Sequence, residues 1–176
     1  MTPLTINTHW LSGPHLPEPT VRAKFTAVAT GEYSDTDVAN IIGWYYETGA
    51  AVGIDPALAC AQMWLETGHL TSAWSQRPHR NPAGIGVTGA PGAGVSFPSW
   101  LDAVRAHVGR LLAYALPWGA GTGPQLALIE DALAWRDLPD ARRGLGADVE
   151  TLARFWAADP AYPDKLIGVL NDWRRV

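Results

Sequence analysis

Apolar residues recur at helical spacing through most of the chain beyond residue 33. One face of residues 36–52 collects five of them, three or four positions apart or adjacent: Val38, Ile41, Ile42, Tyr45 and Tyr46. Ser34, Asp35 and Thr36 stand at the start of this segment and are suitable N-cap residues. The pattern predicts an amphipathic helix over residues 36–52.

A second helix is predicted from its boundary residues. Gly53 breaks the first helix, and Asp55 can cap the free N–H groups of a new helix whose first position suits Pro56. This helix should run to about Thr67 and end at Gly68.

Ser99 and Asp102 have the spacing of a capping box and predict a third helix that ends before Pro117. Apolar periodicity then predicts three more helices, over about residues 124–135, 147–157 and 163–173.

Two segments lack helical periodicity. Residues 71–98 are rich in Pro, Gly, Ser, Thr and Asn and contain two short alternating runs, which fit a small β-hairpin or a loop lobe. Residues 1–33 are rich in proline and predict an extended arm, with a short helical piece around residues 21–29. We therefore expect a mainly α fold, with the N-terminal arm over 1–33 and one helical domain over 34–176.

Composition excludes several classes of function. The 176 residues are enough for one domain, and the net charge of −4 with scattered basic residues does not favour a nucleic-acid partner. No apolar run approaches the ~20 residues of a membrane-spanning helix. The N-terminus lacks the basic start and apolar stretch of a signal peptide. We expect no nucleic acid and no membrane among the partners.

The single cysteine, Cys60, excludes an internal disulfide and a cysteine-based metal cluster, and its place in a helical pattern indicates packing. The five histidines show no paired ligand spacing, and His107 fits a structural histidine better than a ligand. We expect no metal and no cofactor.

The candidate chemistry centres on one carboxyl group among tryptophans. Nine tryptophans stand against three phenylalanines, and indole faces can stack on sugar rings as well as fill a core. Glu66 lies in the last turn of the second predicted helix, next to the apolar Trp64 and Leu65 and close to Gly68. Apolar surroundings and helix C-terminal carbonyls both raise the pKa of a carboxyl group, as a catalytic acid requires. A solvated glutamate at a helix end is the alternative.

The segment from Gly53 to Gly68 resembles the catalytic helix of the glucosaminidase family, glycoside hydrolase family 73. Further segments match in order. Residues 81–86 resemble the family's Asn-x-Phe-Gly-Ile-Lys stretch, and residues 95–104 resemble its aromatic segment before the next helix. Residues 157–166 resemble its Ala-Thr-Asp-Pro-x-Tyr-x-x-Lys-Leu sequence. The resemblance covers about residues 38–170.

This resemblance implies an α+β lysozyme-like fold and cleavage of the glycosidic bond after N-acetylglucosamine in peptidoglycan, with Glu66 as the proton donor. Tyr162 matches a family tyrosine that is expected to line the cleft near the acid, although a core tyrosine is the alternative. Asn81 matches a family asparagine that either fixes the loop or contacts the acetamido group of the substrate, and the loop role is favoured.

Three positions depart from the family pattern. His69 stands where the family commonly has Trp, Ala83 where it has Phe, and Gly86 where Lys is usual. Trp74 or Trp100 would supply replacement stacking surface, with core packing as the alternative. His69 joins them as a candidate substrate-binding residue, and a second catalytic role is not expected of it.

A second catalytic carboxylate is hard to find. Residues 68–100 contain neither Asp nor Glu, which leaves three candidates that caps or solvation also explain: Asp102, Asp159 and Glu47. We expect that the substrate's own 2-acetamido oxygen, or a water molecule, attacks the anomeric carbon while Glu66 protonates the leaving oxygen.

These observations predict a monomeric endo-β-N-acetylglucosaminidase that hydrolyses peptidoglycan glycan strands, as an autolysin or endolysin at the bacterial cell wall. The protein would reach the cell wall by release from a longer precursor, by a phage lysis route or by a nonclassical route. The alternatives are a wall-binding module that has lost turnover, a purely structural helical domain, and a lytic transglycosylase.

Overall fold

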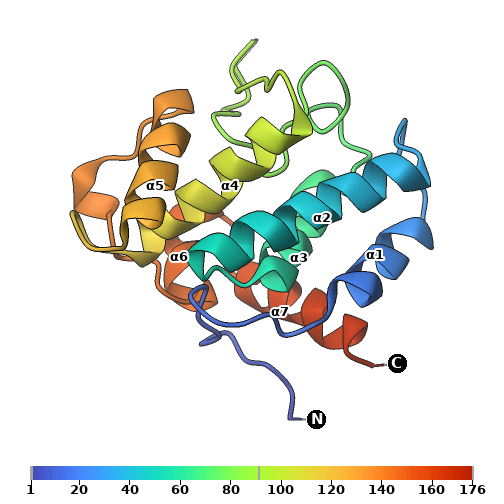
Figure 1. Cartoon of the computed structure of the whole chain (residues 1–176), viewed down its shortest axis with the longest axis horizontal. Coiled ribbons are helices and arrows are strands. Elements are labelled where there is room, and N and C mark those ends of the chain that lie inside the picture. The colour runs from blue at the N-terminus through green and yellow to red at the C-terminus, as the bar shows by residue number, and fades with distance from the viewer. Residues whose placement is uncertain (1, 91, 176) are drawn as a thin grey trace.

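The computed structural model describes residues 2–90 and 92–175, and it places seven α-helices and one short 3-10 helix in them (Figure 1). The mainly helical class expected from the sequence is confirmed. No helix in the described ranges is both long and apolar enough to cross a membrane. The bounds of the elements are α1 Glu18–Thr26, α2 Asp35–Val52, α3 Pro56–Thr67, α4 Trp100–Ala115, α5 Gly123–Trp135, η1 Asp140–Arg142, α6 Val149–Trp156 and α7 Tyr162–Trp173.

Local capping signals account for the start of the helices that hold the site. Ser34 and Asp37 form a capping box on α2, with the Asp37 N–H donating to Ser34 Oγ over 3.2 Å. Asp55 caps α3, because its Oδ1 accepts from the N–H groups of Ala57 at 2.9 Å and Leu58 at 3.3 Å. Gly68 ends α3 in the left-handed region, with φ of 54°.

Helix α3 lies in the middle of the molecule. All eight residues from Pro56 to Met63 are buried, and α3 packs against α1, α2 and α7. A helix that is apolar all round is expected to be surrounded by others. Cys60 is fully buried in this segment, as its assignment to packing predicts. The buried stretch leaves only the last turn, with Glu66, to face the outside.

The N-terminal segment does not form a separate extended arm. Residues 2–33 include α1, which begins three residues before the predicted helical piece, and they contribute to the common core through the fully buried Trp10, Val21 and Phe25. The Trp10 carbonyl also accepts from the N–H of Asp55 at 2.8 Å. A division at residue 33 therefore does not correspond to a break in packing. The buried indole of Trp10 lies outside the predicted domain of residues 34–176 and belongs to the same core.

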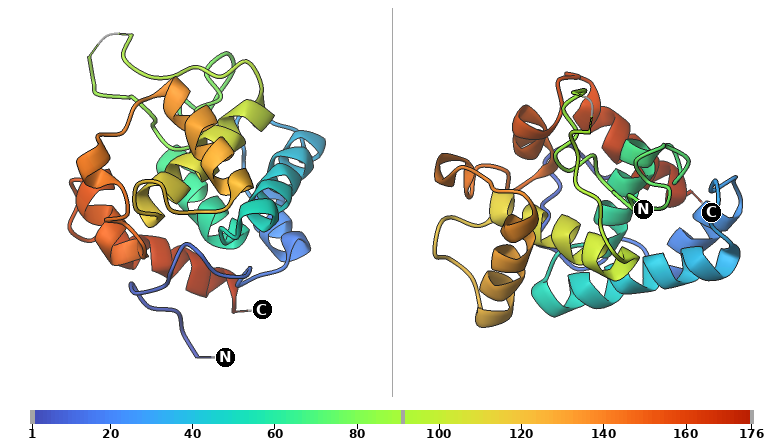
Figure 2. Two further views of the ribbon diagram at one scale, coloured as in Figure 1. Left: turned by 60° about the vertical axis from the view of Figure 1, so that its left-hand side comes forward. Right: turned by 90° about the horizontal axis from the view of Figure 1, so that it is seen from above.

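The segment between α3 and α4 forms a loop lobe at the opposite end of the molecule from both chain ends, as Figure 2 shows. Of the two alternatives, hairpin or loop, the described residues have the loop. One backbone hydrogen bond, from the N–H of Val95 to the carbonyl of Ile85 at 2.9 Å, joins the two alternating runs. Glycine-rich sequence on both sides of them leaves too little side-chain pairing for strands.

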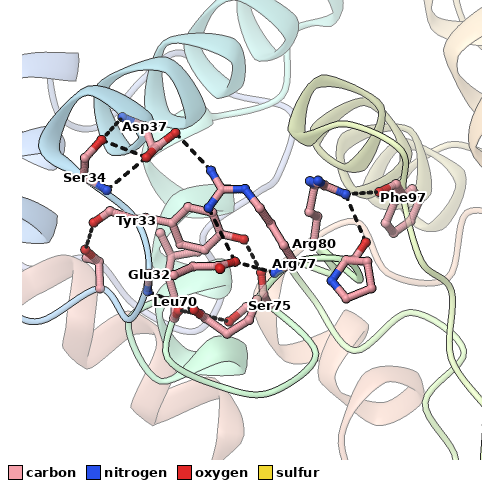
Figure 3. A network of polar contacts seen from close by, with 12 residues as sticks. Glu32, Tyr33, Ser34, Asp37, Leu70, Ser75, Arg77, Arg80 and Phe97 are labelled. Carbon is pink, nitrogen blue, oxygen red and sulfur yellow. Dashed lines mark hydrogen bonds and ion pairs between the residues drawn. The ribbon is translucent and has the colours of Figure 1, made fainter.

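A polar network fixes the base of this loop to the start of α2 (Figure 3). Arg77 donates to Asp37 Oδ1 at 3.2 Å and pairs with Glu32, and the Tyr33 hydroxyl donates to the carbonyl of Ser75 at 2.7 Å. Arg80 donates to the carbonyl of Phe97 at 3.1 Å and so joins the two ends of the loop. The loop is thus held at its base while its tip projects.

Helices α4 and α5 cross at very short range over Gly109. A Cβ atom at this position would lie 2.4 Å from the carbonyl oxygen of Leu128 and 2.6 Å from Cβ of Ala132. Both atoms belong to rigid parts of α5, so glycine is what permits the crossing.

Gly109→Ala is expected to lower the free energy of unfolding by about 1–3 kcal/mol, since overpacking outweighs the gain of about 1 kcal/mol in helix propensity. Gly43→Ala in α2 is the matched control, because nothing lies within 4 Å of its added Cβ. That control should be stabilising. Urea unfolding of both variants measures the difference, and two changes of the same sign would contradict the close crossing.

Candidate active site

Glu66 lies at the wall of a cavity of about 540 Å³ between the loop lobe and the ends of α4, α5 and α6. Loop residues 83–88 form one side of it, and aromatic and arginine side chains form the other. A second hollow of about 330 Å³ touches Glu66, Trp156 and Tyr162. Another cavity of about 550 Å³, next to Tyr46, has no carboxyl group among its lining residues. The chemistry therefore concentrates at Glu66.

One oxygen of Glu66 is fully engaged. The Tyr162 hydroxyl donates to Oε1 at 2.6 Å, and the indole N–H of Trp156 donates to the same oxygen at 3.0 Å. The other oxygen, Oε2, faces Gly84, where an added Cβ would lie 4.0 Å away. When the carboxyl group is protonated, its proton therefore belongs on Oε2, which is on the side of the loop and the cavity.

Tyr162 is the end of a buried hydrogen-bond chain that begins on α2. Tyr45 Oη bonds to His107 Nδ1 at 2.8 Å, and His107 Nε2 bonds to Gln62 Oε1 at 3.0 Å. Gln62 Nε2 then donates to Tyr162 Oη at 2.9 Å. All of these side chains are buried.

The protonation state of His107 gives the chain its direction. Burial lowers the pKa of His107 to about 3, with a further decrease from Arg110, so the imidazole is neutral. Because Gln62 Oε1 can only accept, the imidazole proton lies on Nε2 and the Tyr45 hydroxyl donates to Nδ1. In each hydrogen bond from Tyr45 to Glu66, the donor is then on the Tyr45 side and the acceptor is on the Glu66 side.

Burial raises the pKa of the Glu66 carboxyl above its ordinary value of 4.5, and the hydrogen bonds from Tyr162 and Trp156 offset part of that increase. Burial also raises the pKa of the Tyr162 hydroxyl, and the negative charge of Glu66 adds to this increase. Tyr162 consequently remains a donor, and Glu66 is the group that can lose a proton to the cavity.

Aromatic faces line the cavity beside the carboxyl group. The rings of Tyr114 and Phe155 are nearly parallel, 19° apart with centroids at 6.3 Å, and Trp156 lies edge-on to Tyr114. Tyr114 is 3% exposed and Arg110 lies over its ring, so Phe155 and Trp156 are the half-buried rings whose faces can stack on sugar rings.

The structure places Asn81 inside the loop. Its side-chain amide donates to the carbonyls of Ile85 at 2.9 Å and Val95 at 3.0 Å, and its oxygen accepts from the N–H groups of Ala83 and Ile85. The side chain is 1% exposed and lines neither cavity that touches Glu66. Asn81 thus holds the loop conformation and has no free hydrogen-bonding group for an acetamido contact.

The other candidate substrate-binding residues lie outside both cavities that touch Glu66. Trp100 is 6% exposed and packs edge-on against Tyr33. Trp74 packs on His79 with ring centroids at 4.3 Å, and His69 lies 3.9 Å from Trp64 in the same way. Their aromatic surface is used in these contacts, whereas the half-buried rings of Phe155 and Trp156 line the cavity at Glu66.

Candidate second carboxylates are engaged elsewhere. Asp102 bonds to Ser99 Oγ at the start of α4 and, like the exposed Glu47, lines neither cavity at Glu66. Asp159 lines the smaller hollow, where it forms an ion pair with Lys165 over 2.5 Å. This bond lowers the pKa of the exposed Asp159 carboxyl. In the larger cavity Glu66 is the one acidic lining residue among those described.

Sequence reasoning missed Gln62, Trp156 and the arginines of the cavity. Gln62 could have been found, because it lies one helical turn before Glu66 on the same face. Trp156 stands directly before the segment that resembles the family's C-terminal motif, but no local pattern marks it. Within the described ranges there is no group of three or more His, Cys, Asp or Glu residues that could hold a metal ion.

The family model described as mannosyl-glycoprotein endo-beta-N-acetylglucosaminidase, named Glucosaminidase, matches residues 43–175. The chain belongs to the glucosaminidase family. An uncharacterized protein of Borreliella burgdorferi is 26% identical over 151 residues, which cover 84% of this chain and 68% of that protein. No solved structure matches the chain. Family membership makes the protein a glycoside hydrolase by class, and the match includes Glu66, Tyr162 and Trp156.

Glu66→Gln is expected to raise the free energy of unfolding near pH 8 and to lose this advantage as the pH falls below 4.5. The folded-state pKa of Glu66 lies above 4.5, so the unfolded chain releases the proton first as the pH rises. The contribution of Glu66 to the free energy of unfolding therefore decreases as the pH rises above 4.5, and a glutamine at this position does not cause that decrease. Urea unfolding at pH 4 and pH 8 measures it, with the exposed Glu47→Gln as control for removing one charge. An equal difference at both pH values would contradict the raised pKa.

Tyr162→Phe is expected to raise the pKa of Glu66 further, because it removes the hydroxyl that donates to the ionised carboxylate. An NMR titration of the Glu66 side-chain carbon measures the change directly. Tyr46→Phe is the matched control, since the Tyr46 hydroxyl donates to the carbonyl of Leu16. A Glu66 pKa that is unchanged or lower in Tyr162→Phe would show that this hydrogen bond does not stabilise the charged form.

Proposed function

We propose that this glucosaminidase-family protein is an endo-acting peptidoglycan hydrolase that cleaves the glycosidic bond after N-acetylglucosamine, with Glu66 as general acid. The observation that carries the proposal is the asymmetric carboxyl group: Oε1 accepts two hydrogen bonds, whereas Oε2 is open toward the cavity. A raised pKa at such a position is typical of a catalytic acid. The expected place of action is the bacterial cell wall, outside the cell or after phage delivery.

In the proposed reaction Oε2–H donates its proton to the glycosidic oxygen as the bond from that oxygen to the anomeric carbon breaks. The carbonyl oxygen of the substrate's 2-acetamido group forms a new bond to the anomeric carbon. Water then opens this cyclic intermediate and gives a proton back to the Glu66 carboxylate. Direct attack by water, with its proton passing to solvent, is the variant of the same scheme.

The scheme needs one essential carboxyl group from the protein. It is supported by the lining of the larger cavity, where Glu66 is the acidic residue, and by the ion pair that occupies Asp159. A retaining or inverting pair of carboxylates would require a second acidic group within about 5 to 9.5 Å. The aromatic faces of Phe155 and Trp156 would support the sugar rings next to the bond that is cleaved.

Glu66→Gln is expected to reduce the rate of peptidoglycan hydrolysis by about 10²- to 10⁴-fold, the usual contribution of a general acid. The glutamine can still accept from Tyr162 and Trp156, so the fold should persist, which circular dichroism checks. The measurement is the release of reducing ends and muropeptides from purified peptidoglycan, with Glu47→Gln as a control on α2.

The products decide between the alternatives. N-acetylglucosamine at the new reducing ends is expected, whereas 1,6-anhydro ends would identify a lytic transglycosylase. A native protein that binds peptidoglycan on several wall types without releasing products would be a binding module. Loss of turnover in a folded Asp159→Asn variant would contradict the mechanism with a single carboxyl group.

A further inference from the structure

Three arginines line the same cavity as Glu66 and come from three different elements. Arg110 lies on α4, Arg136 is the C-cap of α5, and Arg142 belongs to η1. They line it together with Tyr114, Phe155 and Trp156. The chain as a whole is negative, with a net charge of −4, whereas this cavity gathers three positive side chains.

These guanidinium groups are not neutralised by ion pairs in the described part of the chain. Five other arginines do form such pairs: Arg22, Arg77, Arg105, Arg154 and Arg175. Arg110 instead donates to the backbone carbonyls of Arg136 at 2.8 Å and Asp137 at 3.4 Å, which ties α4 to the end of α5. The Asp137 carboxylate acts on Arg110 at longer range without an ion pair.

The opposite wall carries no charge of either sign. Loop residues 83–88 contain only apolar residues, glycine and Thr88, and no Asp or Glu occurs anywhere in residues 68–100. With Glu66 protonated, all of the charges that line the cavity are therefore positive. A concave surface with charges of one sign concentrates ligands of the opposite sign.

We propose that Arg136 and Arg142 form a subsite for carboxylate groups that the substrate carries beside its glycan chain. This inference rests on the proposed function and adds to it the residues that would bind the acidic groups of the substrate. In peptidoglycan such carboxylates are found on the lactyl arm of the neighbouring sugar and on the peptide attached to it. Planar guanidinium groups bind carboxylates through two parallel hydrogen bonds, which suits both sources.

Arg136 and Arg142 are the residues to test, because both side chains are exposed and neither is part of the core. Arg110 is left unchanged, since its bonds to two carbonyls have a structural role. The background is Glu66→Gln, which allows binding to be measured without turnover. The control replacement is Arg22→Gln, an exposed arginine of α1 outside the cavity.

Three probes separate the sources of charge. The first is an N-acetylglucosamine–N-acetylmuramic acid tetrasaccharide with its peptides, the second is the same glycan without peptides, and the third is chitotetraose, which has no carboxylate. Calorimetric dissociation constants are measured at low and high salt for Glu66→Gln and for Glu66→Gln with Arg136→Gln and Arg142→Gln.

The double arginine replacement is expected to weaken binding of a carboxylated probe about tenfold relative to chitotetraose, as for loss of a charge-assisted hydrogen bond. High salt should have the same effect. A loss confined to the first probe assigns the subsite to the peptide, and a loss for both acidic probes assigns it to the lactyl carboxylate.

Equal affinity for all three probes, or equal loss on all three, would overturn the inference even if the native protein hydrolyses peptidoglycan. The charge-dependent pattern would support it even if the native protein releases no products, so the two proposals fail independently.

Discussion

The buried hydrogen-bond chain from Tyr45 to Glu66 is the interaction on which the candidate site depends. It connects α2, α4, α3 and α7 in turn, and the polar side chains from Tyr45 to Tyr162 are buried, where water does not replace a missing partner. A buried donor or acceptor left without a partner costs about 1–3 kcal/mol. The same hydrogen bonds therefore hold four helices together and orient the Glu66 carboxyl group.

Most of the helical framework could be predicted from the sequence, because its signals are local. Asp55 with Pro56 and Ser99 with Asp102 each mark a helix start within four residues, and Ser34 was one of three N-cap candidates for the first helix; α3, α4 and α2 begin at these positions. The predicted end of α3 at Gly68 also agrees with the structure. The uncertain part was the glycine-rich lobe, where short alternating runs fit a hairpin and a loop equally well.

The site itself was predictable only where a motif carried the information. Glu66 and Tyr162 are 96 positions apart, and nothing in helical spacing indicates that their side chains meet. Trp156 and the cavity arginines meet at one cavity because of how α4, α5 and α6 pack, and a pattern along the sequence does not show this. Trp74 and Trp100 lie outside the cavities at Glu66, and the sequence could not indicate this because the type of a residue does not reveal whether its ring faces a cavity or another ring. The packing of Trp10 into the core could not be predicted, because its neighbours in sequence show no apolar periodicity.

The close crossing at Gly109 links the core to the chemistry in one more way. It brings the end of α5 against α4, where Arg110 bonds to the carbonyls of Arg136 and Asp137, and α5 in turn leads into the segment that carries Arg142. The spacing between Arg110 and the end of α5, where Arg136 lies, therefore depends on a contact in the interior between two helices. A larger residue at position 109 would therefore alter the arginine-lined side of the cavity without replacing any residue that lines it.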